Sequence, residues 1–563
     1  MLPLLLLAPS LAAAIDFSWK HDGEAYWATE VARVSSNATS ILSTSKNGLA
    51  YFSVGSVDWP QFNATEEDLS LPPGAYVSTS IGDDVVIAEA YQVKSDASAQ
   101  AFMHGAFPSD DDSFEAFDSA AIPVPPAVGD GALGGLRFAV KDIFHVKGLK
   151  TSGGSRSYFE AYDAQNYTTE VVEKSIAAGA RLVGKTKTIA FALGTPRNGW
   201  EVDYQDPWNL RGDGYQTTGG SSSGSSAAII AYEWLDFTIG SDTGGSVRFP
   251  ARFAGFYGYK PTHGIYNLTG ILVAIAEQDT PGHMARCPAI FRQVYEAWSA
   301  DTPLADAPTT LPTQLQYWAD EAPLAQPAAE AMKRNFFSNV TAVLNMTTFS
   351  RNLTASHIET FGTGNFSEYY NTVYGDQNSV QFYDQIGADL IDAYGAINDG
   401  AFPPSDPVVN LTFADGVNET TRARYPDSQA KRAAYADWFN TAILPASNSS
   451  DVCTDSIVAH SLHVPPSTVK YDQTPYRLVR GFYNGLQASF AGTPEIVVPI
   501  GQVTYFSPFT LKTEYQTVTV AFQAPKGCDG TLMELVRVLE EQGLIKEVMP
   551  GKTAYEVGTL EAW

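Results

Sequence analysis

Residues 219–226 read Gly-Gly-Ser-Ser-Ser-Gly-Ser-Ser, and residues 242–250 read Asp-Thr-Gly-Gly-Ser-Val-Arg-Phe-Pro. Glycines let backbone N–H groups approach a ligand closely, and successive N–H groups in a turn form an anion-binding concavity. The pattern suits a serine nucleophile with an oxyanion hole formed by its own backbone. Segments 227–230 and 237–240, between the loops, are apolar enough to be buried, which argues against a flexible glycine–serine linker.

A serine hydroxyl is a weak nucleophile and needs a positioned base. None of the eight histidines lies in a recognisable triad motif, so a Ser-His-Asp mechanism has no local support. Lysine can replace histidine when burial or neighbouring positive charge keeps it neutral. Lys141 ends the apolar, strand-like segment 138–141 and is the candidate base. Without the serine loops, the same lysine would be read as a surface residue with a buried stem.

Together with Val140-Lys141-Asp142, the two loops resemble the amidase signature family of serine amidohydrolases. The resemblance implies that Ser246 is the nucleophile and Lys141 the base. It also implies that Ser221, held by a cis peptide, passes the proton between them. Two further residues would brace the nucleophile loop, namely Asp242 and Arg248. Backbone N–H groups would form the oxyanion hole, from Thr243, Gly244, Gly245 and Ser246.

The resemblance covers about residues 121–563 and leaves the preceding region unexplained. One departure concerns the two loops, because Ser221 and Ser246 are one residue further apart than is usual in the family. If the extra residue lies between Ala227 and Phe237, Ser221 is the relay serine; if it lies in the first loop, Ser222 is. We keep Ser221, with Ser222 as the alternative. Other segments that carry the resemblance are residues 148–155, 178–186, 253–262, 492–501 and 525–529.

Two other motifs match only by their spelling. Residues 220–224 satisfy the G-x-S-x-G nucleophile elbow, but that elbow must follow a strand and residues 212–218 read as a loop. Residues 179–186 satisfy the Walker A pattern, which must follow a strand and open a helix. Here a helix-like segment precedes and a strand-like segment follows. We therefore predict a helix-to-strand turn rather than a phosphate loop.

Composition narrows the expected partners and cofactors. The chain has 563 residues, 44% of them hydrophobic, which is enough for a sizeable core. Its net charge of −27 argues against nucleic acid as a partner, because phosphate binding needs clustered Lys and Arg. Three cysteines, Cys287, Cys453 and Cys528, fit no zinc pattern and allow at most one internal disulfide, whose pair stays open. We expect no metal and no cofactor.

The first 14 residues form a short apolar stretch that ends in Ala12-Ala-Ala14, typical of a secretory signal peptide cleaved after Ala14. The stretch lacks Lys and Arg before its apolar part. Glycosylation sequons support the secretory route, and no later run is long and apolar enough to span a membrane. We therefore predict a secreted glycoprotein with no membrane partner. The sequons are at Asn37, Asn63, Asn166, Asn267, Asn339, Asn345, Asn352, Asn365, Asn410, Asn418 and Asn448.

The fold class expected is α/β, with a mixed central β-sheet flanked by helices and a smaller N-terminal region. We place that region at residues 15–120, with a strand at 85–93, and the amidase signature domain at 121–563. A helical insertion that carries six sequons is expected at about 303–426. Expected strands cover residues 136–141, 237–240, 456–459 and 495–499, and expected helices cover 171–178, 327–344, 428–444 and 530–543.

We predict an amidohydrolase that cleaves the C–N bond of a small carboxamide substrate through an acyl-enzyme. An esterase with the same site is the nearest alternative, since acyl transfer does not require an amide. A secreted, non-catalytic binding protein on an amidase fold is a second. The signature is shared by a glutamine-amide-transferring subunit of a tRNA-dependent complex, which the leader and sequons argue against. The oligomeric state is left open, a homodimer included.

Overall fold

The computed structural model of the protein describes most of the chain. The predicted signal peptide and the sequons at Asn37 and Asn63 lie outside the described residues. The described ranges are 17–21, 24–35, 49–54, 74–81, 84–109, 112–117, 121–127, 129–194, 201–363, 365–462 and 477–557.

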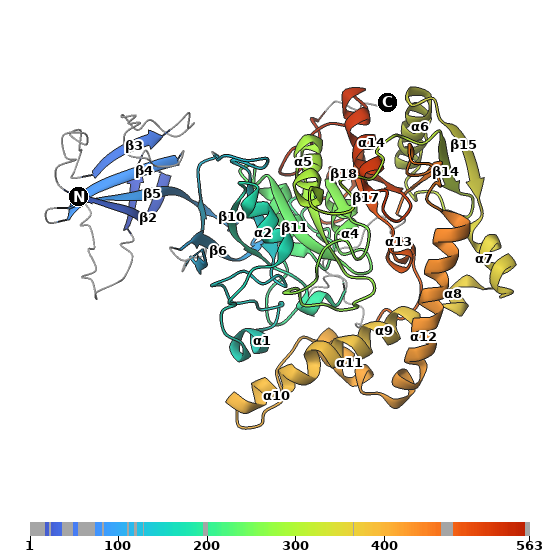
Figure 1. Ribbon diagram of the computed structural model, residues 1–563, viewed down its shortest axis with the longest axis horizontal. Helices are drawn as coiled ribbons and strands as arrows, with labels where there is room; N and C mark the ends of the chain where they lie inside the picture. The colour runs from blue at the N-terminus through green and yellow to red at the C-terminus, as the bar shows by residue number, and fades with distance from the viewer. Residues whose placement is uncertain are drawn as a thin grey trace.

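A large mixed sheet runs through the main body of the molecule (Figure 1). β9 pairs in parallel with β10 and β11, and β14 pairs in parallel with β15 and β16, whereas the other neighbours in the sheet are antiparallel. This arrangement confirms the predicted α/β class with a mixed central sheet. In order across the sheet, the strands are β15 (Thr347–Arg351), β14 (Gln314–Trp318), β16 (Ser456–His460), β18 (Thr513–Gln523), β17 (Glu495–Phe506), β12 (Tyr257–Lys260), β13 (Thr280–Ala285), β11 (Phe237–Asp242), β9 (Arg137–Lys141), β10 (Arg181–Thr186), β6 (Phe102–Pro108) and β7 (Phe114–Ala116).

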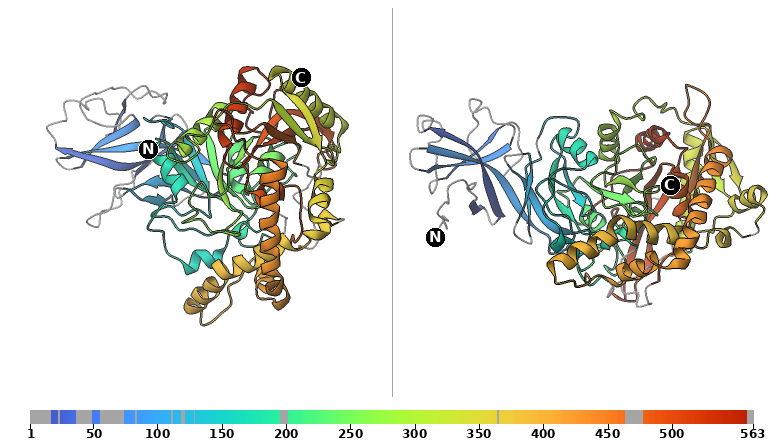
Figure 2. Two further views of the ribbon diagram at one scale, coloured as in Figure 1. Left: turned by 45° about the vertical axis from the view of Figure 1, so that its right-hand side comes forward. Right: turned by 60° about the horizontal axis from the view of Figure 1, so that its bottom comes forward.

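A smaller antiparallel sheet lies apart from this body, as Figures 1 and 2 show. The chain passes between the two sheets more than once, because β6 and β7 join the large sheet before β8 returns to the small one. The region around the boundary predicted near residue 120 is therefore shared by both sheets. The strands of the small sheet are β1 (Phe17–His21), β2 (Glu24–Ser35), β3 (Leu49–Val54), β4 (Gly74–Ile81), β5 (Asp84–Ser95) and β8 (Ala121–Val124).

Helices cover both faces of the large sheet. Successive side chains of a strand point to opposite faces, so Phe138 and Val140 of β9 join one core cluster and Ala139 joins the other. Lys141, two residues after Ala139, follows the alternation toward the second face. The first cluster includes residues of α2 (Glu170–Ala177), α5 (Pro288–Ser299) and α14 (Asp529–Glu541), and the second includes residues of α3 (Ser223–Ala231) and α4 (Arg248–Ala254).

A group of helices extends along the lower and right-hand edges of Figure 1. It occupies much of the predicted insertion at 303–426, but that segment also supplies β14 and β15 to the sheet, and α6 packs on β17 and β18. The remaining helices are α1 (Arg156–Ala161), α6 (Pro327–Val343), α7 (Leu353–Phe361), α8 (Phe366–Tyr369), α9 (Val373–Phe382), α10 (Ala388–Ile397), α11 (Pro407–Gly416), α12 (Glu419–Trp438) and α13 (Leu486–Ala491), with short 3₁₀ or π segments at Ala190–Ala192, Tyr383–Gly387 and Phe439–Ile443.

The two motifs that match only by their residue pattern have the local structure predicted for them. The Walker A look-alike forms a turn after α2 followed by β10, and the elbow look-alike has no strand directly before it. A disulfide joins Cys453 to Cys528, and Cys287 is free. Within the described ranges, no helix is long and apolar enough to cross a membrane, and no cluster of His, Cys, Asp and Glu is arranged to hold a metal.

Candidate active site

Lys141 lies at the end of β9 and is fully buried. Its Nζ donates hydrogen bonds to Ser221 Oγ at 2.7 Å and to Ser241 Oγ at 2.9 Å. The Gly220–Ser221 peptide bond is cis. The structure therefore joins the predicted base to the predicted relay serine, 80 residues further along the chain.

Burial lowers the pKa of Lys141 to about 7, because the cationic form loses its hydration. The carboxylates of Asp279 and Asp242 oppose this effect by favouring the charged form. A lysine with this pKa is neutral in a large fraction of molecules at neutral pH. It can therefore accept a proton from Ser221.

Ser246 closes the second glycine–serine loop, between the end of β11 and the start of α4. Its backbone carbonyl accepts a hydrogen bond from the Ser222 N–H at 3.4 Å, so the two loops lie against each other. Ser246 is 8% exposed and lines a cavity together with Gly220 of the first loop. The predicted nucleophile is thus accessible from the cavity, whereas Ser221 and Lys141 are buried behind it.

The nucleophile loop is held by a buried ion-pair chain. Asp242 accepts hydrogen bonds from the backbone N–H groups of Gly245, Val247 and Arg248 at 2.8–3.2 Å. The Arg248 guanidinium donates to both Asp242 oxygens, at 2.7 and 3.0 Å, and to Glu495 Oε2 at 2.8 Å. Burial acts to raise the pKa of Asp242, but the adjacent guanidinium outweighs it and holds that pKa below its usual range. These contacts tie the Asp242 and Arg248 side chains to the backbone of the loop that carries Ser246.

One of the four predicted oxyanion donors is already engaged. The Gly245 N–H points to Asp242 Oδ1 at 2.8 Å, so the structure removes Gly245 from the set. The N–H groups of Thr243, Gly244 and Ser246 donate to no other group among the described residues. Three backbone donors remain for an oxyanion. The sequence could not reveal this, because it does not show which way each peptide of a glycine turn faces.

The two alternatives for the relay serine differ clearly in their contacts. Ser221 accepts a hydrogen bond from Lys141, whereas Ser222 Oγ makes only a long contact, 3.4 Å, with the Ser241 carbonyl. The neighbouring Ser223 hydroxyl is buried and has no partner among the described residues. The geometry therefore favours Ser221 over Ser222.

Four residues that bear on the site were not predicted, namely Ser241, Asp279, Tyr483 and Glu495. Asp279 is buried, and its Oδ2 accepts hydrogen bonds from the Ala274 and Ile275 N–H groups at 2.6 and 3.3 Å. The Tyr483 hydroxyl donates to the Gly244 carbonyl at 2.8 Å. Glu495 lies in a segment that carries the family resemblance, but the residue pattern of that segment does not indicate that Arg248, 247 residues away, is its partner.

The cavity in front of Ser246 has a volume of about 310 Å³. Its lining is mostly apolar, aromatic or neutral polar, and Arg477 is the one charged residue among the described residues that line it. Residues from distant parts of the chain meet here, among them Phe249, Tyr374, Val408 and Tyr483. The site thus has room for a small organic molecule next to the serine.

The predicted glycosylation sites that fall within the described ranges are on the surface. Asn339 is partly buried, and the others are exposed. Asn352, Asn365 and Asn418 are helix N-caps whose side chains accept backbone hydrogen bonds. The exposed sites are Asn166, Asn267, Asn345, Asn352, Asn365, Asn410, Asn418 and Asn448.

A mixed α/β domain with a buried lysine and two serines at paired glycine loops is the arrangement of an amidase-type enzyme. Residues 94–333 match the family model for Amidase, so over this segment the chain is similar to members of that family.

Curated relatives share part of this segment. The chain is 38% identical to Amidase 1 of Arabidopsis thaliana over 175 residues, which are 31% of this chain and 40% of that protein. It is 40% identical to a glutamyl-tRNA(Gln) amidotransferase subunit from Chromohalobacter salexigens over 177 residues, 31% of this chain and 34% of that protein. The matched segments thus span well under half the length of these relatives.

The fold has solved counterparts. A glutamyl-tRNA(Gln) amidotransferase subunit from Thermotoga maritima superposes with a TM-score of 0.56, covering 82% of this chain and 92% of that one at 18% identity. At this identity the likeness concerns the fold alone.

Proposed function

We propose that this protein hydrolyses the C–N bond of carboxamides through an acyl-enzyme on Ser246. One observation carries the proposal: the buried Lys141 amine donates to Ser221 Oγ at 2.7 Å, directly behind the loop that presents Ser246 to a cavity. This contact supplies a base for a serine that has no histidine partner. The similarity to proteins named amidase and amidotransferase supports an amide over an ester as the substrate.

The proposed reaction begins with attack of Ser246 Oγ on the carbonyl carbon. The Ser246 proton passes to Ser221, and the Ser221 proton passes to neutral Lys141. The N–H groups of Thr243, Gly244 and Ser246 stabilise the oxyanion, and each such donor is worth about 10²–10³ in rate. The proton returns through Ser221 to the leaving nitrogen as the C–N bond breaks. Water then attacks the Ser246 ester by the same relay and releases the acid.

The cavity supports a small substrate with an uncharged acyl group. Its lining includes Phe249, Val408 and Tyr483, and its one described charged residue is the exposed Arg477. A linear, largely apolar amide fits this lining better than a multiply charged one, because unpaired charges are costly to bury. The proposed substrate class is therefore linear aliphatic or aromatic amides.

The test is hydrolysis of matched primary amides, anilides and esters by the wild type and by serine variants. Ser246→Ala and Ser221→Ala are expected to lose on the order of 10⁴ or more in kcat/KM. Ser223→Ala is the matched control, since its buried hydroxyl has no described partner, and it should stay within about threefold of the wild type. Turnover by Ser246→Ala at the wild-type rate would overturn the proposal. Activity on esters alone would reassign the protein as an esterase.

The proposal includes a secretory route for the chain. The Cys453–Cys528 disulfide supports it, because disulfides persist in oxidising compartments, and so do the exposed sequons. Expression in a eukaryotic secretory host should give protein in the medium that begins at Ile15 and loses mass on treatment with an N-glycosidase. Retention of an unmodified chain inside the cells would contradict this part of the proposal.

A further inference from the structure

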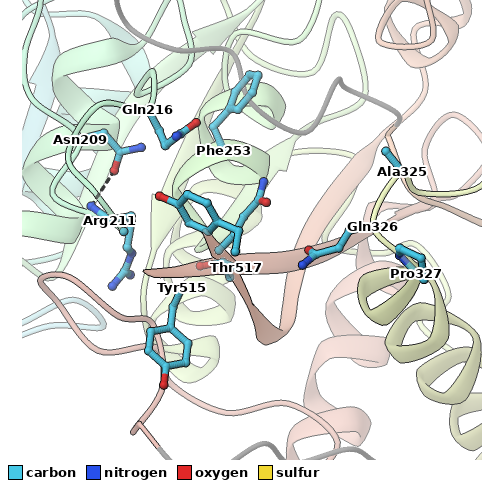
Figure 3. Close-up of a pocket in the computed structure, with 12 residues that line it drawn as sticks. Asn209, Arg211, Gln216, Phe253, Ala325, Gln326, Pro327, Tyr515 and Thr517 are labelled. Atoms are coloured by element: carbon cyan, nitrogen blue, oxygen red, sulfur yellow. Dashed lines mark hydrogen bonds between the residues drawn. The ribbon is translucent and has the colours of Figure 1, made fainter. Parts of the chain in front are cut away.

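A second cavity, lined in part by Phe253 of α4, shares none of its lining residues with the cavity in front of Ser246. Its volume is about 310 Å³. Figure 3 shows Asn209 and Arg211 on one side of it, Gln326 and Pro327 on the other, and Thr517 of β18 between them. A narrow extension of about 20 Å³ adjoins this cavity and is lined by Arg252.

Arg252 is an unpaired buried cation. It is only 8% exposed, and it forms no hydrogen bond or ion pair with any residue that the structure describes. Burial alone lowers its pKa to about 10, so it still carries its charge at neutral pH. A buried charge is ordinarily paired, because transfer from water without a partner costs several kcal/mol. Arg252 Nε is thus fully buried without a partner among the described residues, whereas its two Nη atoms are not fully buried.

No acidic side chain among the described residues lines the space around Arg252 in either of the two adjoining cavities, although the whole chain carries a net charge of −27. The Nη2 atom of Arg211 is also buried without a partner among the described residues. Its Nε and Nη1 atoms donate hydrogen bonds to the backbone carbonyls of Ala254, Gly551 and Thr553. The N-terminus of α6 also borders the larger cavity at Gln326 and Pro327, and its first turn carries Glu330, which accepts a hydrogen bond from the Leu324 N–H at 2.9 Å.

The size and lining of the cavities indicate which anion fits. A space of about 20 Å³ at Arg252 accommodates little more than one small polar group, such as a carboxylate oxygen. The larger cavity beside it is lined by Phe253, Tyr505 and Tyr515, which provide aromatic surface for an apolar body. A planar carboxylate also matches the fork of a guanidinium.

We propose that these adjoining cavities form a second ligand site, which binds a small aromatic or aliphatic monocarboxylate through Arg252. The carboxylate pairs with the Arg252 guanidinium, and the apolar body lies between Phe253 and the aromatic side chains of β17 and β18. The site is separate from the Ser246 cavity and does not depend on the proposed hydrolysis.

Binding of benzoate, measured by isothermal titration calorimetry, tests this assignment. The wild type should bind one benzoate with a millimolar or tighter Kd, and Arg252→Met should bind it at least about tenfold more weakly. Neutral benzamide, of the same shape, should also bind at least about tenfold more weakly than benzoate. Arg477→Met is the matched control, because it removes the arginine of the other cavity, and its benzoate affinity should equal that of the wild type.

A second variant keeps the test independent of Arg252 itself. Ala325 is exposed and lines both adjoining cavities, so Ala325→Trp should fill them from the surface and weaken benzoate binding while the fold is retained. The proposal is overturned if the wild type fails to bind benzoate at about 10 mM, or if Arg252→Met binds as well as the wild type. It is equally overturned if only Arg477→Met loses binding, or if inorganic phosphate binds more tightly than benzoate.

Discussion

Arg248 and Arg252 lie one turn apart on α4, and both are buried, but only Arg248 has hydrogen-bond and ion-pair partners among the described residues. Arg248 donates hydrogen bonds to Asp242, Glu495 and Ser489. Burial acts to lower its pKa, but the carboxylates of Asp242 and Glu495 raise it. Arg252 has no described partner, and burial lowers its pKa to about 10. The first arginine is satisfied within the chain and positions the nucleophile loop. Arg252, by contrast, is available to pair with the proposed carboxylate ligand.

Arg248→Met is expected to have the largest effect, because it leaves two buried carboxylates without their counter-charge. The free energy of unfolding should fall by about 3–5 kcal/mol, and the labelling of Ser246 by a fluorophosphonate should become slower. Urea unfolding followed by circular dichroism measures the first, and intact mass measures the second. Arg248→Lys should recover only part of both, since an ammonium lacks the guanidinium fork. A fully stable Arg248→Met protein would show that the ion-pair chain does not hold the loop.

Tyr483→Phe should have an intermediate effect on stability and on the labelling of Ser246. It tests the Tyr483 contact with the loop separately from the Asp242–Arg248 contact. It removes the hydrogen bond to the Gly244 carbonyl and leaves Asp242 and Arg248 in place. The free energy of unfolding should fall by about 0.5–1.5 kcal/mol, and labelling of Ser246 should slow by less than about tenfold. A loss as large as that of Arg248→Met would mean that Tyr483, and not the ion pair, sets the position of the loop.

Arg252→Met should have the smallest effect on stability. Without ligand, the unfolding free energy should stay within about 1 kcal/mol of the wild type or increase, because an unpaired buried charge is replaced by an apolar side chain of similar length. Comparison of the urea midpoints of Arg252→Met and Arg248→Met gives the contrast directly. Equal destabilisation by the two substitutions would show that Arg252 has an internal role that the structure does not reveal.

Much of the fold was predictable from local patterns. The apolar run ending at Lys141 predicted β9, and the periodicity of residues 327–344 predicted α6 to within one residue. The weaving of the chain between the two sheets was not predictable. It depends on packing such as that of Trp27 on Tyr91 and Phe107, which brings β2, β5 and β6 together from residues far apart in sequence.

Candidate site residues that lie in short sequence motifs could be predicted. Residues that reach the site only through the folding of distant segments were missed. The glycine loops and the strand-ending lysine singled out Ser246, Ser221 and Lys141 as candidates, and the family resemblance assigned their expected roles. Glu495 and Asp279 belong to other elements, and their approach to Arg248 and Lys141 is set by the sheet order. Gly245 was wrongly included among the oxyanion donors, because peptide orientation is decided by the Asp242 carboxylate.

The most direct test of the account is the pH dependence of covalent labelling of Ser246 by a fluorophosphonate, which requires no knowledge of the substrate. Lys141 has a pKa lowered to about 7, so the fraction of neutral base rises with pH through that value. The labelling rate of the wild type should therefore increase about tenfold per pH unit below 7 and level off above it. Lys141→Met should react slowly, with no such rise. A rate that peaks in acid and falls above neutrality, or a label on a residue other than Ser246, would contradict the account.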